Sequence, residues 1–346
     1  MSFSLSQLEH PIVQAPMGGG PSTPALAAAV SQAGGLGFLA AGYRGTAALR
    51  EEIGELRRLT QRPFGVNLFV PAPARADRGA LDAYASTLAG EATRYEVELG
   101  EPVHDDDGWD AKLALLAAER VPVVSVTFGC PSRAEVEGLH AAGCALWMTI
   151  TTAAEAVAAR DAGADALVVQ GVEAGGHRGS FDEAAPGDVG LLALLQLVQA
   201  ETDLPLVATG GIATGRGVAA VLAAGAAAAQ LGTAFMLTPE AATSPAHRHA
   251  LRGTAPTALT RAFTGRSARG IENRFMREHE PDSPLGYPEV HHLTAPIRAA
   301  ARERGDADGF HLWAGQAHRL AAELPAGELV QRLTADAREA LRSAQI

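Results

Sequence analysis

Short apolar runs alternate with amphipathic, alanine-rich segments up to residue 236, and this alternation limits the possible folds more than any other feature. Eight of the apolar runs have the length and composition of strands, near residues 12–14, 37–40, 64–69, 123–128, 145–149, 166–170, 206–209 and 228–231. Segments with helical periodicity lie between most of them, at 46–60, 132–142, 152–162, 189–200 and 214–224. Strands that are separated by helices pair in parallel through right-handed crossovers. Eight such strands predict an α/β protein of the closed (β/α)8 type, a TIM barrel, whereas an open doubly wound sheet would use fewer strands and a glycine-rich first turn.

The alternation fails in two stretches of the chain. Between residues 71 and 120 the connection is longer than one crossover and contains a polar segment at 101–110, which predicts an extra helix or a lid. From residue 238 to about 304, proline, histidine, arginine and glycine become frequent and the alternation of strands and helices stops. We therefore expect a barrel formed by residues 1–237 and 305–346, and a smaller inserted domain, 238–304, that covers the substrate.

Composition and charge exclude several classes of protein. Hydrophobic residues make up 47% of the 346 residues, which is too high and too evenly spread for a disordered chain. The net charge is -11 and no block of lysine or arginine stands out, so we expect no nucleic-acid partner. No stretch has the length of a membrane span and the first ten residues do not resemble a signal peptide, so we expect a cytoplasmic protein. Cys130 and Cys144 lack metal-ligand spacing, and the trio 105–107 is typical of a solvated acidic loop, so we expect no metal.

The residues that could perform chemistry follow the predicted strands, at the end of a barrel where active sites lie. The first strand is followed by Ala15-Pro16-Met17-Gly18-Gly19-Gly20, in which three glycines allow the backbone to approach a ligand closely. Asn67 lies at the end of the third strand, and its amide can both donate to and accept from a heteroaromatic ring. Taken singly, each of these features also fits an ordinary turn.

The most informative loop follows the sixth strand. Gln170 ends that strand, and Gly175-Gly176-His177-Arg178-Gly179 comes shortly after it. Glycine pairs expose backbone N–H groups to an anion or a polarised ring. An imidazole titrates near neutral pH, so His177 can take or give a proton at working pH. Because glycines on both sides would hold its ring in the open mouth of the barrel, we expect a catalytic role for His177.

Three neighbouring candidates leave alternatives open. Arg178 either adds positive charge to the site or points into solvent. Phe128 ends the fourth strand and either packs near the ligand or belongs to the core. Tyr287 lies in the inserted segment, where it could close over a substrate, although a surface turn fits it better.

The loops after the last two strands indicate a phosphate group. The sequence is Thr209-Gly210-Gly211-Ile212 after the seventh strand and Gln230-Leu231-Gly232-Thr233 at the eighth. Barrels commonly build phosphate sites from these two loops and a short helix N-terminus. The glycines offer N–H donors without side-chain obstruction, and Thr233 adds a hydroxyl. Two such loops opposite the Gly-Gly-His loop favour a cofactor with a phosphate tail.

Together these segments resemble the signature blocks of the nitronate monooxygenases, formerly called 2-nitropropane dioxygenases. The blocks lie at residues 14–19 with 26–36, at 125–129, at 173–179 and at 208–233. The resemblance extends from about residue 10 to 240 and resumes at 291–296 and 313–316. The blocks at 173–179 and 210–233 are specific in combination, because either one alone also fits related flavin enzymes.

The resemblance implies flavin mononucleotide (FMN) held noncovalently in the barrel mouth. It implies that Asn67, Gln170 and Gly175 approach the isoalloxazine and ribityl parts, that Gly211 and residues 230–233 hold the phosphate, and that His177 is the catalytic histidine. The full set of expected cofactor-binding residues is Ala15, Met17, Asn67, Gln170, Gly175, Gly176, Gly210, Gly211, Gln230, Leu231, Gly232 and Thr233. The implied reaction converts alkyl nitronates, and in a wider reading nitroalkanes, with oxygen into a carbonyl compound and nitrite.

Other functions stay open at this point. FMN-dependent NAD(P)H reductases, acting on enoyl-carrier proteins or quinones, share the barrel and the Gly-Gly-His loop, and they need no separate nicotinamide fingerprint. A non-catalytic barrel that binds a flavin or another phosphate ligand, or a phosphate-handling isomerase, is the alternative from another class. His177 either removes a proton or, when protonated, stabilises the nitronate oxygens. The oligomeric state is also open, with a homodimer as one expected assembly.

Overall fold

The computed structural model describes residues 3–73 and 75–344, and its central sheet has eight parallel strands. These are β1 (Ile12–Gln14), β2 (Gly37–Ala40), β3 (Phe64–Phe69), β4 (Val123–Thr127), β5 (Ala145–Ile150), β6 (Ala166–Gln170), β8 (Leu206–Thr209) and β9 (Ala228–Leu231). Their order is β1-β9-β8-β6-β5-β4-β3-β2, and a further parallel bridge from Val13 to Leu36, next to β2, closes the sheet. The predicted (β/α)8 barrel is therefore confirmed.

The two ends of the barrel differ in what fills them. Alternate strand positions point inward, and an inner cluster of apolar side chains packs there: Val13, Leu36, Phe38, Val123, Trp147, Ala166, Val168, Val207 and Ala228. The N-terminal segment, with the short 3-10 helix η1 (Leu5–Gln7), packs against this cluster through Phe3, Leu5 and Leu8. At the carboxyl ends of the strands, polar residues such as Gln14, Gln170 and Thr209 take over. The barrel is thus plugged at one end and lined with polar groups at the other.

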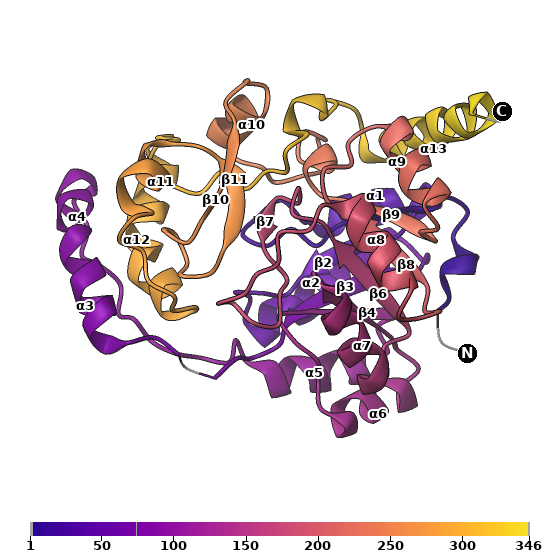
Figure 1. The fold of residues 1–346 in the computed structure, drawn as a ribbon, viewed down its shortest axis with the longest axis horizontal. Coiled ribbons are helices and arrows are strands. Elements are labelled where there is room, and N and C mark those ends of the chain that lie inside the picture. Colours follow the sequence, from indigo (N-terminus) through magenta and orange to yellow (C-terminus); the bar gives the residue numbers. More distant parts are fainter. Residues whose placement is uncertain (1–2, 74, 345–346) are drawn as a thin grey trace.

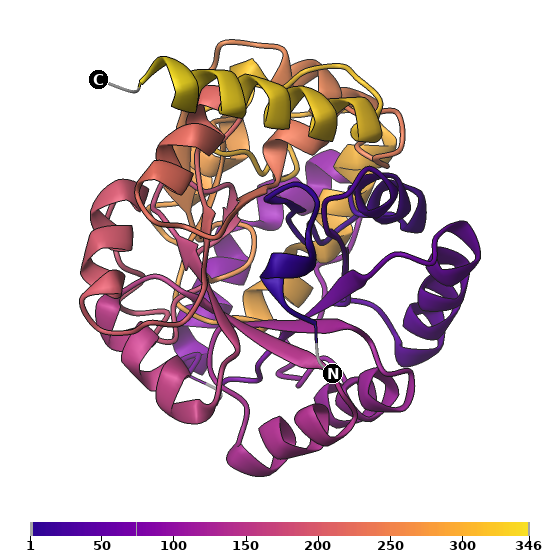
Figure 2. The same cartoon turned by 90° about the vertical axis from the view of Figure 1, so that its right-hand side faces the viewer.

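Helices surround the barrel and bury their apolar faces against the strands (Figure 2). They are α1 (Pro24–Gln32), α2 (Thr46–Leu59), α5 (Trp109–Ala118), α6 (Arg133–Ala141), α7 (Ala153–Ala162), α8 (Leu191–Gln199), α9 (Gly215–Ala223) and α13 (Ala326–Ser343). Thr23, Ser132, Thr152 and Thr214 begin four of them as N-caps, because each side-chain oxygen accepts a hydrogen bond from a backbone N–H of the first turn. Helix α13 packs against α9 and α1 and completes the ring. In the described part of the chain, no helix combines the length and apolarity needed to cross a bilayer.

A second group of elements lies beside the barrel mouth (Figure 1). Its antiparallel sheet joins β10 (Thr257–Thr260), β11 (Ala268–Ile271) and the two-residue β7 (Gly176–His177). Its helices are α3 (Arg78–Thr87), α4 (Ala89–Tyr95), α10 (Pro245–Leu251), α11 (Arg274–His279) and α12 (Glu289–Glu303), with short 3-10 helices η2 (Thr233–Phe235) and η3 (His318–Leu320). A separate core, which includes Tyr84, Phe263, Phe275, Ile297 and Phe310, holds them together. The role of residues 238–304 as a substrate-covering domain stays a prediction.

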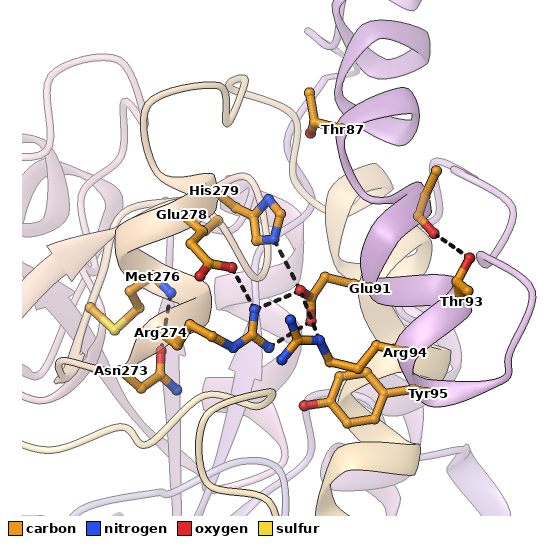
Figure 3. A network of polar contacts seen from close by, with 12 residues as sticks. Thr87, Glu91, Thr93, Arg94, Tyr95, Asn273, Arg274, Met276, Glu278 and His279 are labelled. Atoms are coloured by element: carbon orange, nitrogen blue, oxygen red, sulfur yellow. Dashed lines mark hydrogen bonds and ion pairs between the residues drawn. The ribbon is translucent and has the colours of Figure 1, made fainter.

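Helices α3 and α4 come from the stretch where an extra helix or lid was expected, and a network of charges ties them to α11 (Figure 3). Glu91 of α4 accepts two hydrogen bonds from Arg274 of α11, with Nη1–Oε1 and Nη2–Oε2 distances of 2.6 and 2.8 Å. His279 and Glu278 lie close enough to Glu91 for three metal ligands. Because Arg274 already occupies both oxygens of Glu91, we read the cluster as an ion-pair tie between the two segments.

Candidate active site

A cavity of about 400 Å³ opens at the carboxyl ends of the strands, within the size range of small-molecule sites. Every predicted site residue except Leu231 lines it: Ala15, Met17, Asn67, Gln170, Gly175, Gly176, His177, Gly210, Gly211, Gln230, Gly232 and Thr233. The Leu231 side chain is buried in the core between strands and helices, and its carbonyl oxygen accepts a hydrogen bond from the Ala15 N–H at 2.9 Å. The structure thus brings the predicted residues of five loops to one cavity.

His177 enters this cavity from β7, which pairs with β11 of the second sheet. Its Nε2 atom lies 2.9 Å from the hydroxyl oxygen of Thr264. The rings of Phe128, Tyr287 and Trp313 surround the imidazole, with centroids 5.8, 5.6 and 5.8 Å away. The ring is therefore held on several sides.

The electrostatic surroundings keep His177 neutral. Burial, together with the positive charges of Arg266 and Arg298, lowers the pKa of His177 from its usual value near 6.5 to about 3. At neutral pH the imidazole therefore has a lone pair on one nitrogen and can accept a proton. Without a bound anion beside it, the ring does not provide positive charge.

Gln170 is held in one orientation by its neighbours. Its Oε1 accepts hydrogen bonds from Arg178 Nη1 and from the Gly179 N–H, both at 2.9 Å, while its Nε2 donates to the His177 carbonyl at 3.0 Å. One N–H of Gln170 is then left to donate to a ligand. The reading of Arg178 as solvent-facing was wrong: its side chain is fully buried behind Gln170, where it also donates to the Gly171 carbonyl at 2.7 Å.

Asn67 presents a hydrogen-bond acceptor to the cavity, whereas Gln170 presents a donor. Its Nδ2 donates to the Ser125 carbonyl at 3.2 Å, the Ser125 hydroxyl at 2.9 Å and the Thr127 hydroxyl at 3.1 Å. A carbonyl can only accept, so the nitrogen of the amide must face Ser125. The Oδ1 atom has no partner among residues 3–73 and 75–344 and is left to accept from a ligand. Asn67 and Gln170 thus present an acceptor and a donor, as a heteroaromatic ring requires.

The glycines leave room where a ligand would lie. A Cβ at Gly18 or Gly176 would meet no atom within 4 Å, although both residues line the cavity. Gly210 and Gly211 adopt φ angles of 126° and 66°, which favour glycine and turn the backbone at the end of β8. At Gly175 a Cβ would lie 2.5 Å from backbone atoms of Ala314 and Gly315, so the loop after β6 requires glycine there.

The roof of the cavity contains residues to which the sequence argument gave no role. Arg298 and His291 lie on α12, Arg302 follows one turn later, and His247 and His311 complete the set. Arg298 donates to the Thr294 hydroxyl at 2.9 Å and to the His291 carbonyl at 2.6 Å, and its guanidinium also lies within 3.4 Å of His311 Nδ1. In the sequence, His291, Arg298 and Arg302 are spaced by seven and four residues, which places them on one face of a helix. This spacing was the available sequence signal for these three residues.

No aspartate or glutamate is among the described residues that line this cavity. The chain has a net charge of -11, so the absence of carboxylates from the described lining of this cavity is a local feature. A cavity with arginine and glycine N–H donors and without carboxylates suits an anionic ligand or an anionic part of one.

An aromatic wall separates this cavity from a second one of about 480 Å³. Tyr43, Phe69, Phe128 and His291 line both cavities, and Tyr287 stands in the same wall. Tyr43 and Phe128 adopt φ angles of 65° and 84°, a left-handed conformation that is rare for bulky residues and is concentrated at functional sites. Tyr287 lies in the turn before α12, as the sequence favoured, but its side chain is half-buried and its ring packs against His177.

Replacing Gly18 tests whether the cavity holds the cofactor. A valine at this position would meet open space, so the variant should fold normally and project its methyl groups into the cavity. We expect Gly18→Val to weaken flavin binding by at least about tenfold, measured by fluorescence titration of the apoprotein, because the added methyl groups would occupy space in the cavity that a bound flavin needs. Gly138→Val on the exposed side of α6 is the matched control and should leave flavin affinity unchanged. Equal affinity in both variants would place the cofactor elsewhere.

Fold and cavity define the class first: a (β/α)8-barrel enzyme with a histidine and a cofactor-sized cavity at the carboxyl ends of its strands. Comparison with known proteins defines the family. The family model described as nitronate monooxygenase matches residues 2–336. The chain is 45% identical to a nitronate monooxygenase of Pseudomonas aeruginosa, over 96% of this chain and 97% of that protein. The chain therefore belongs to the nitronate monooxygenase family.

Two solved structures resemble this chain along its whole length. The nitroalkane oxidase of Streptomyces ansochromogenes superposes with a TM-score of 0.95 at 54% identity, covering 99% of this chain and 100% of that one. FabK from Thermotoga maritima superposes with a TM-score of 0.78 at 28% identity, covering 98% and 96% of the two chains. The barrel and the second unit are thus shared along their whole length.

Proposed function

We propose that the protein is an FMN-dependent oxidase of alkyl nitronates and of the parent nitroalkanes, with oxygen as co-substrate and a carbonyl compound and nitrite as products. The observation that supports this most strongly is a neutral histidine in a cavity without carboxylates, next to a buried arginine. The names of the P. aeruginosa and S. ansochromogenes relatives support the same substrate class.

FMN fits the residues of the cavity. We infer that Asn67, Gln170 and Gly175 contact the ring and ribityl parts, and that Gly211 and the residues from Gln230 to Thr233 hold the phosphate. The Thr233 hydroxyl oxygen accepts a hydrogen bond from the Gly315 N–H at 3.0 Å, so its own proton is free to donate to a phosphate oxygen. A bound flavin would supply the electron acceptor, while the protein supplies position and electrostatics.

His177 is proposed as the base that acts on neutral nitroalkanes. The C–H bond next to the nitro group breaks, its electron pair passes to the nitro group, and the proton forms an N–H bond on the imidazole. The products of this step are a nitronate anion and an imidazolium cation. A low pKa makes His177 a weak base before substrate binds. The anion that forms beside the ring raises that pKa, because a nearby negative charge favours the protonated form.

Arg298 is proposed to stabilise the anion. Four of its five N–H groups are engaged with Thr294, His291 and His311, which leaves one Nη1 N–H without a partner among the described residues. The Arg298 charge also reaches His177, whose pKa it lowers. The division of roles is thus a neutral histidine that removes the proton and a fixed arginine that binds the resulting charge.

Product analysis tests this proposal. Aerobic incubation with an alkyl nitronate should consume oxygen and release nitrite and the carbonyl compound, with FMN identified as the released flavin by chromatography. A protein that consumes NADH and an enoyl or quinone acceptor, and produces no nitrite from any nitronate, would instead be the reductase alternative. The proposed cytoplasmic location and homodimer are tested separately, by fractionation and by light scattering.

A further inference from the structure

Thr264 is placed to decide which nitrogen of His177 bears the proton. Its side chain is buried at 2% exposure, in the turn that precedes β11, and its hydroxyl oxygen lies 2.9 Å from His177 Nε2. The same oxygen lies 3.2 Å from the carbonyl oxygen of Arg266. A threonine hydroxyl has one proton, so it can donate to only one of these two atoms.

The Arg266 carbonyl can only accept a hydrogen bond. Among residues 3–73 and 75–344 no other donor reaches it, and Arg266 itself is 2% exposed. If the hydroxyl turned toward His177, this buried carbonyl would lose its partner, and an unpaired buried carbonyl is strongly unfavourable. The hydroxyl therefore donates to Arg266, and its lone pair accepts from the imidazole.

We propose that Thr264 is a positioning residue that holds neutral His177 as the Nε2–H tautomer and so presents the Nδ1 lone pair for proton abstraction. No hydrogen-bond partner of Nδ1 is present among the described residues, while Nε2 is engaged. The rings of Phe128, Tyr287 and Trp313 restrict the alternative of a ring flip. Thr264 lines the same cavity as His177, and in this scheme it influences the reaction through its hydrogen bond to His177.

The kinetic part of the test rests on the proposed function and compares two substrates. A neutral nitroalkane needs the base, whereas a preformed nitronate does not. We expect Thr264→Val, which keeps the shape and removes the hydroxyl, to lower kcat/KM for the nitroalkane by about tenfold, as an order of magnitude for a misplaced general base. Turnover of the nitronate should stay within about twofold of the wild type. Thr264→Ser should restore nitroalkane turnover.

A double-mutant cycle separates positioning from general damage to the fold. In a His177→Asn background, Thr264→Val should have no further effect on nitroalkane turnover, because the group on which it acts is gone. An equal loss for both substrates in the single variant, or a further tenfold loss in the double variant, would overturn the proposal.

A direct readout is independent of catalysis. The holoenzyme labelled with ¹⁵N-histidine should show His177 as the Nε2–H tautomer by NMR, with the signal assigned by its loss in His177→Asn. Thr264→Val should shift this signal toward a mixture of tautomers. A wild-type Nδ1–H signal would overturn the proposal. If the wild type oxidises neither nitroalkane nor nitronate, the proposed function fails, while the NMR signal still decides the tautomer.

Discussion

His177→Asn is expected to lower kcat/KM for a neutral nitroalkane by about 10²–10⁴-fold, the usual contribution of a general base. Asparagine resembles the imidazole in size and polarity but cannot accept a proton at working pH. In the wild type, the pKa of about 3 keeps His177 in its accepting form across the neutral range. Steady-state oxygen consumption at several nitroalkane concentrations measures the effect.

Preformed nitronate is the internal control for this variant. Its oxidation requires no proton removal, so His177→Asn should reduce it by less than about tenfold, and the FMN content should match the wild type. Equal losses for both substrates would show that His177 acts on the anion and not as a base. Unchanged nitroalkane turnover would remove His177 from the mechanism.

Acid is expected to destabilise the protein steeply below about pH 6.5. Four histidines line the cavity with lowered pKa values: His177 at about 3, His247 at about 4, His291 at about 2, and His311 well below its usual value. Burial is the main cause for each. The unfolded chain binds protons near pH 6.5 and the folded chain does not, so stability is lost as the pH falls from about 6.5 toward 4. Each histidine contributes on the order of 1 kcal/mol by pH 5.5.

Thermal unfolding at pH 7.5 and pH 5.5, with saturating FMN in both buffers, measures this loss. His247→Gln removes one of the four groups and keeps a donor for the Trp313 carbonyl, which lies 3.1 Å from His247 Nε2. It should reduce the drop in Tm between the two pH values. His249→Gln, on the exposed side of the same helix, should not. Equal drops in all three proteins would show that the cavity histidines titrate normally.

The barrel was predictable from sequence because its signal is local. Each strand is a short apolar run between turn residues, and Val123–Thr127 or Ala145–Ile150 differ from the expected bounds by a single residue. The loops that follow the strands were predictable for the same reason, since a parallel barrel brings all carboxyl ends to one face. Gly175, His177 and Gly211 therefore meet in one cavity as expected.

The positions of other side chains at the site could not be predicted, because they depend on contacts between segments that are distant in the sequence. Arg178 is adjacent to His177 in sequence, but only the pairing of β7 with β11 shows that its side chain turns away to hold Gln170. Arg298 lies 121 residues after His177, and the spacing of His291, Arg298 and Arg302 marks one face of a helix without showing that this face lines the cavity. Leu231 was expected at the site because it belongs to a phosphate-site motif. Strand alternation instead turns its side chain into the core.

Anaerobic reduction of the bound flavin tests the central claim most directly. The purified holoenzyme is mixed without oxygen with an alkyl nitronate or with NADH, and the visible absorbance of the flavin is followed. The proposed function predicts that the nitronate bleaches the flavin within one turnover and that NADH does not. Bleaching by NADH together with no change on addition of nitronate would contradict it and assign the cavity to a reductase.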